Sequence, residues 1–132
     1  MISVALAKNL KEAGLAWEPA MGDRIGTISS FSGEAAEITD VVASTGGPFS
    51  MMGHIQGLRS IYPRDSVYWL PPLESLIAEV DKFGVSWELS PGTFSLVQRM
   101  GAFKIPLKTF SSESIEQSVA EGLLWLMQQK QG

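Results

Sequence analysis

The chain has 132 residues, of which 45% are hydrophobic, and it carries a formal net charge of −4. This length predicts one domain, residues 1–132, and the apolar fraction is that of a globular protein rather than a disordered one. The absence of cysteine excludes disulfides, thiolate nucleophiles and cysteine-based metal sites. The ten basic residues form no stripe that would follow a phosphate backbone, so the charge opposes nucleic-acid binding.

The N-terminal sequence MISVALAKNLKEAG has its lysines after the apolar residues and lacks a long apolar core. This pattern predicts neither a signal peptide nor an anchor. No apolar run approaches the roughly 20 residues that a helix needs to cross a bilayer. We therefore expect a cytoplasmic protein with no membrane partner.

The first expected element is a helix over residues 3–14. Leu6 and Leu10 belong to an apolar stripe with helical spacing. Ser3 is a suitable N-cap, because its hydroxyl can accept an N–H of the first turn. Gly14 suits the left-handed position that follows a helix end.

Strands are expected next, over residues 24–31 and 35–43, with a bulge where Val41 and Val42 break the alternation. Residues 44–53 are the least regular part because they combine glycines with a proline. A short strand over 54–62 and a turn at 62–65 follow.

The most clearly patterned stretch is 66–90, which predicts a strand, a helix and a second strand. The helix begins after Pro71-Pro72, carries the apolar stripe of Leu73, Leu76, Ile77 and Val80, and ends at Gly84. Residues 85–89 then alternate apolar and polar side chains, as in a half-buried strand.

Two further strands and a last helix complete the chain. Pro106 interrupts the second of these strands, and its missing N–H predicts a sheet edge or a bulge. The last helix is expected from about Ser112 to Gln129, with Ser111 as its cap. Its apolar face is broad enough to suggest a second contact, such as a neighbouring chain.

Short loops between consecutive strands favour antiparallel pairing. The expected fold class is therefore α+β, with a mainly antiparallel sheet of five or six strands and three helices packed mostly on one face.

Catalytic chemistry finds little support in the sequence. His54 is the only histidine, and a nucleophile–base arrangement with Ser50 and Asp40 lacks any recognised motif. Dispersed carboxylates give no metal-ligand spacing, and no phosphate-binding glycine loop is present. We therefore expect no catalytic residue, no metal and no cofactor.

A candidate binding surface lies on the irregular segment and the strand after it. Methionines in a glycine-rich loop can adapt to a partner, and arginine beside aromatic residues is typical of binding hot spots. The alternative interpretation is that the loop caps the core and that alternate residues of the strand are buried. The candidate residues are Phe49, Met51, Met52, His54, Arg59, Tyr62 and Arg64.

Three segments resemble a loose group of small uncharacterised bacterial and phage-associated proteins. Leu6-Ala7 with Leu10 to Leu15 is similar to their L-x-x-L-K-E-A-G opening helix, and Trp69-Leu70-Pro71 to their W-L-P-x-L-x-x-L segment. Leu123 to Leu126 resembles the end of their C-terminal L-L-W-L helix. The resemblance implies a small accessory protein of bacterial or mobile-element origin, and it carries over no activity or site residue.

The leading functional hypothesis is a non-catalytic binding or protein-interaction module, acting as a homodimer or with a protein partner. The runner-up is a small enzyme or ligand-binding protein with a pocket between the 44–57 loop and the sheet, lined by Ser50, His54, Arg59 and Arg64. A nucleic-acid-associated regulator is a third hypothesis, and it predicts a salt-dependent gel shift.

Overall fold

The computed structural model describes residues 1–31, 34–44, 50–55 and 58–131. The chain divides into two compact units, and the single domain expected from its length stays a prediction. The N-terminal unit is Ser3–Leu70, and the C-terminal unit is Pro71–Gly132 together with Met1–Ile2. Within the described ranges, no helix is both long enough and apolar enough to pass through a membrane.

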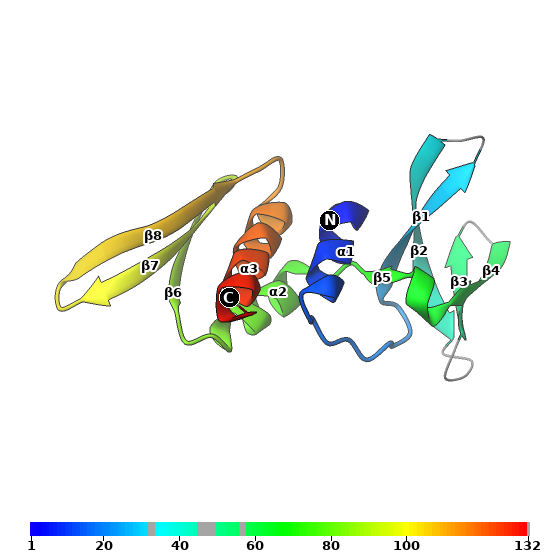
Figure 1. Ribbon diagram of the computed structural model, residues 1–132, viewed down its shortest axis with the longest axis horizontal. Helices are drawn as coiled ribbons and strands as arrows, with labels where there is room; N and C mark the ends of the chain where they lie inside the picture. The colour runs from blue at the N-terminus through cyan, green and yellow to red at the C-terminus, as the bar shows by residue number, and fades with distance from the viewer. Residues whose placement is uncertain (32–33, 45–49, 56–57, 132) are drawn as a thin grey trace. The chain divides into compact units, whose positions relative to one another are not determined.

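The N-terminal unit joins one helix to a five-stranded antiparallel sheet of order β4-β3-β2-β1-β5 (Figure 1). A single 3-10 turn, η1, precedes the last strand of this sheet. The elements are α1 (Val4–Glu12), β1 (Arg24–Phe31), β2 (Glu34–Ser44), β3 (Ser50–Ile55), β4 (Leu58–Pro63), η1 (Arg64–Ser66) and β5 (Tyr68–Trp69).

Helix α1 begins and ends at the residues that its sequence predicts. The Ser3 hydroxyl accepts the Leu6 N–H at 3.1 Å, which satisfies one of the donors that a helix start leaves without a partner. Gly14 takes a φ of 106°, and the Leu15 N–H then returns to the Leu10 carbonyl at 3.0 Å. This ending directs the chain into the extended segment that carries Trp17.

One cluster in the core of the N-terminal unit combines side chains from three strands and from the segment between η1 and β5. Ile25, Val42, Met51 and Val67 are each 1% exposed and pack together. Burial of this kind stabilises a unit by about 1.5–3 kcal/mol for each large side chain. The register between β2 and β3 shifts between Val42 and Ser44, next to the predicted bulge.

The C-terminal unit contains two helices and a three-stranded antiparallel sheet of order β6-β7-β8. Helix α3 packs on β7 and β8 and also contacts α2 (Figure 1). The elements are α2 (Leu73–Asp81), β6 (Ser86–Ser90), β7 (Thr93–Met100), β8 (Phe103–Ser111) and α3 (Ile115–Gln131).

Both expectations for Pro106 are met. Strand β8 is an edge of its sheet, and the β7–β8 register shifts at Leu96/Val97, where Val97 faces Pro106. An edge position leaves one side of a strand without a ladder, so a residue that lacks an N–H is tolerated there.

The cap of the last helix differs from the expected one. Ser111 is the final residue of β8, and its hydroxyl lies 3.4 Å from that of Thr93. The Ser114 hydroxyl instead accepts the Gln117 N–H at 3.1 Å, and α3 begins at Ile115. Several serines precede this helix. Because the first of them pairs across the strands, the serine that caps the helix lies three positions further along the chain.

The α+β class and the antiparallel pairing are confirmed, but the strands form two sheets instead of one. The strand–helix–strand pattern of 66–90 is present as β5, α2 and β6. Its two strands join different sheets, because β5 pairs with β1 while β6 pairs with β7.

Candidate functional site

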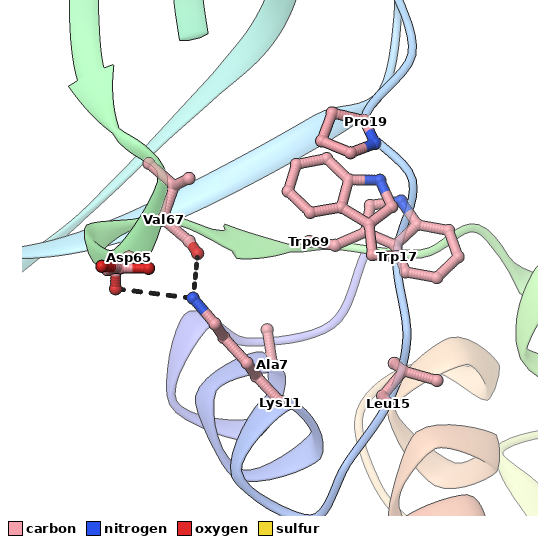
Figure 2. A pocket seen from close by; sticks show the side chains of 8 residues that line it. All are labelled: Ala7, Lys11, Leu15, Trp17, Pro19, Asp65, Val67 and Trp69. Atoms are coloured by element: carbon pink, nitrogen blue, oxygen red, sulfur yellow. Dashed lines mark hydrogen bonds between the residues drawn. The ribbon is translucent and has the colours of Figure 1, made fainter. Parts of the chain in front are cut away.

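A pocket of the described structure lies in the N-terminal unit, between α1, the segment that follows it, η1 and β5. Its volume is about 250 Å³. Figure 2 shows its lining side chains, with two indoles on one side and a lysine reaching across the other. The lining residues are Ala7, Lys11, Leu15, Trp17, Pro19, Asp65, Val67 and Trp69.

A hydrogen bond from its indole nitrogen fixes the position of Trp17. Its Nε1–H donates to Oδ2 of Asp23 at 2.8 Å, and the Ala20 N–H donates to the same oxygen at 3.1 Å. A hydrogen bond to a carboxylate is stronger than one between neutral groups. The extended segment is therefore closed into a loop that fixes one wall of the pocket.

Trp69 forms the second indole of the wall, and β5 positions it. The residue pairs with Ile25 of β1, and its ring lies 6.1 Å from that of Trp17 with an angle of 5° between the planes. Parallel displaced rings at this separation attract one another by about 0.5–1.5 kcal/mol beyond their buried area.

The two indoles differ in one respect that matters for binding. The Nε1 atom of Trp69 is buried and has no hydrogen-bond partner among the described residues, whereas that of Trp17 has Asp23. A buried donor without an acceptor costs about 1–3 kcal/mol. An acceptor supplied from outside would remove that cost.

Lys11 closes the opposite side of the pocket. Its ammonium donates to the Val67 carbonyl at 3.3 Å and to the Asp65 carbonyl at 3.4 Å (Figure 2). It also lies 5.3 Å from the centre of the Tyr68 ring, within the range of a cation–π contact. The lysine therefore ties α1 to the segment that leads into β5.

The pocket is small and mostly apolar. Drug-sized sites usually exceed about 300 Å³, so a pocket of about 250 Å³ suits a smaller group. Its walls are aromatic and aliphatic, with the exposed Asp65 and the engaged Lys11 at one end. It has no nucleophile beside a base, and the described residues contain no cluster of three carboxylate or histidine side chains that could hold a metal.

The candidate surface that the sequence predicted is divided between the two faces of the β3–β4 hairpin. Met51 pairs with Tyr62, and both pack in the core, with Met51 1% exposed. The Tyr62 hydroxyl donates to Oδ2 of Asp40 at 2.8 Å, and Asp40 is itself 5% exposed. Met51 is therefore buried and Tyr62 half-buried, and a binding role for either residue stays a prediction.

The other face of the hairpin keeps part of that surface. Met52 is half-buried, and it pairs with Ile61, which is 71% exposed. The register places the positions of His54 and Arg59 opposite one another on this same face. A binding role for this face stays a prediction, and Phe49 lies outside the described residues.

The remaining hypotheses for this region are not tested. Arg64 opens the η1 turn, and its side chain lies outside the described part, as does that of Ser50. Residues 45–49 and 56–57 are likewise outside the described residues.

The candidate residues chosen from the sequence include none of the residues that line this pocket. One signal was present in the chain: Trp17-Glu18-Pro19 and Trp69-Leu70-Pro71 repeat the pattern Trp-x-Pro. In both copies the residue directly before the proline, Glu18 or Leu70, favours extended backbone.

No protein-family model, curated protein or solved structure matches this chain.

Proposed function

We propose that this protein is a non-catalytic binding module, and that the pocket of its N-terminal unit receives an apolar side chain of a protein partner. The observation that carries the proposal is the indole N–H of Trp69. It is a buried donor without a described acceptor beside an aromatic pocket of about 250 Å³.

The side chains that line the pocket determine which kind of group would fit it. Stacked indoles and aliphatic side chains favour a compact apolar group, and the Trp69 N–H favours a carbonyl next to it. A peptide supplies both, because each side chain is adjacent to a backbone carbonyl. The pocket is also preformed in part, since Asp23 holds Trp17 and Lys11 bonds two backbone carbonyls.

The proposal is tested by titrating the protein with N-acetyl-leucinamide and N-acetyl-prolinamide at millimolar concentration. Four tryptophans give four indole N–H resonances in a nitrogen–proton correlation spectrum. Those of Trp17 and Trp69 should shift on titration. Trp87 and Trp125 belong to the C-terminal unit and serve as internal controls.

Variants of α1 sharpen the test. Ala7 is 2% exposed and lines the pocket, so Ala7→Leu should fill it and abolish the shifts. Ala5 is exposed on the same helix and lies outside the pocket, so Ala5→Leu should leave them unchanged. N-acetyl-glycinamide, which has a carbonyl but no side chain, should bind at least about tenfold more weakly. Equal shifts at all four tryptophans, or none, would contradict the proposal.

A further inference from the structure

The hairpin of β7 and β8 exposes an apolar surface. Phe103 is 76% exposed, Met100 54%, Leu107 49% and Ile105 45%. Met100 pairs with Phe103, and Ile105 lies two positions further along the same face. Nearer the base of the hairpin, β7 instead contributes fully buried residues to the core, and α3 packs there. The end of the hairpin therefore continues the sheet beyond the helix (Figure 1).

Exposure of the apolar side chains of this hairpin to water is unfavourable in free energy. Two strands without a packed face are at best marginally stable, and monomeric proteins rarely expose contiguous apolar patches. Across the tip, Gly101 takes a φ of 63°, which produces a tight turn and keeps the exposed residues close together. The geometry indicates a surface that another molecule covers.

The charge of the hairpin is opposite to that of the rest of its unit. Residues 93–111 contain Arg99, Lys104 and Lys108 and no acidic residue. The remainder of the C-terminal unit has two basic and seven acidic residues, including Glu74 on α2 and Glu121 on α3. Segregated charge of this kind favours association between the basic part of one molecule and the acidic part of another.

Two of the three hairpin cations have contacts within the unit. Lys104 lies 2.7 Å from a carboxylate oxygen of Glu88, and Lys108 lies 5.5 Å from the centre of the Trp125 ring. Arg99 is exposed, forms no ion pair with any described residue, and pairs across the strands with Lys104. Like charges directly opposite are destabilising, and among the described residues an ion pair offsets the charge of Lys104 but not that of Arg99.

Pairing along the strand edge is opposed by the sequence of β8. Pro106, two lysines and a bulge are all devices that prevent edge-to-edge pairing. If two β8 strands paired antiparallel about Pro106, Lys104 would face Lys108 of the second strand. Contact must therefore come through the side chains at the end of the hairpin.

We propose that the occupant is a second copy of this chain, and that each β7–β8 hairpin of a two-fold dimer packs on the acidic helices α2 and α3 of the other copy. Two-fold symmetry repeats this contact. The apolar end of each hairpin is then covered, and the basic charge of each hairpin lies against the acidic charge of the other copy's helices. This interface is independent of the pocket in the N-terminal unit.

Sedimentation velocity of the full chain over micromolar concentrations tests the proposal. We expect a monomer–dimer equilibrium that weakens in about 0.5 M salt, because screening shortens the reach of surface charges. Phe103→Ser and Arg99→Glu should each raise the dissociation constant at least about tenfold. Met21→Ser is the matched control, since Met21 is 75% exposed in the other unit, and it should leave association unchanged.

Far-ultraviolet circular dichroism would verify that each variant is folded. A chain that stays monomeric at every concentration overturns the proposal, and so does one that stays monomeric and binds phosphatidylserine vesicles through Phe103. A dimer that survives Phe103→Ser, or that Met21→Ser disrupts, overturns it equally.

Discussion

The indoles of Trp17 and Trp69 lie 5° from parallel with ring centres 6.1 Å apart, yet among the described residues only the N–H of Trp17 has an acceptor. The pair joins the segment after α1 to the last strand of the N-terminal sheet. The stack is a structural contact, and its second indole N–H has no acceptor among the described residues, which is why we propose the pocket as the candidate site.

The stability of this stack is measurable. Trp17→Ala should lower the free energy of unfolding by about 1–3 kcal/mol, because it removes the ring contact and the hydrogen bond to Asp23. Trp17→Phe keeps an aromatic ring and loses only the hydrogen bond, so its loss should be smaller. Urea unfolding followed by circular dichroism measures both variants. Equal losses for the two would contradict the contribution of stacking.

The hydrogen bond between Tyr62 and Asp40 connects β4 to β2 across the strand that lies between them. Tyr62→Phe leaves a buried carboxylate oxygen without this donor, and it should cost about 1–3 kcal/mol of unfolding free energy. Tyr68→Phe is the matched control in the same unit, with an expected change within about 0.5 kcal/mol. If both variants unfold at the same urea concentration as the wild type, the bond contributes nothing.

Close packing of α3 on the sheet depends on Gly122. A Cβ built there would lie 2.6 Å from Cε2 of Phe94, a fully buried ring. Gly122→Ala should therefore destabilise the C-terminal unit by about 1–3 kcal/mol, although alanine is the better helix former by about 1 kcal/mol. The exposed site Gln128→Ala is the control and should be near neutral. Thermal unfolding measures the difference, and a stabilised Gly122→Ala would show that the ring moves freely.

The cap of α3 gives a fourth prediction. Ser114→Ala removes the acceptor of the Gln117 N–H and should cost about 1 kcal/mol. Ser111→Ala removes only an exposed hydroxyl contact with Thr93 and should cost less. Chemical denaturation of the two variants distinguishes the caps. A larger loss at Ser111 would restore the cap that the sequence pattern had favoured.

Local signals determined the elements of this protein. The Ser3 cap and the Gly14 ending fixed α1, and Pro106 placed β8 at an edge. Each of these signals acts through hydrogen bonds or dihedral angles within a few residues, so the sequence is sufficient to find them. The same reasoning failed at Ser114, where several serines offered equivalent caps and a neighbouring strand decided between them.

The candidate site was beyond the reach of such signals. Lys11 bonds the Val67 carbonyl, and Trp17 meets Trp69, although the partners lie far apart in the chain. From sequence alone, a tryptophan is a core residue and a helix lysine is solvated. Whether a tryptophan lines a pocket depends on which distant segment lies beside it.

The sequence by itself determined the α+β class, the antiparallel pairing and the existence of β5, α2 and β6 over residues 66–90. Tertiary structure alone decided that these consecutive elements divide between two units, because β5 pairs with β1 and β6 pairs with β7. The physical reason is that the backbone N–H and C=O groups along the edge of one extended strand are nearly the same as those along any other. Their partners are selected by the burial of side chains from distant segments, such as Ile25 in one unit and Phe94 in the other.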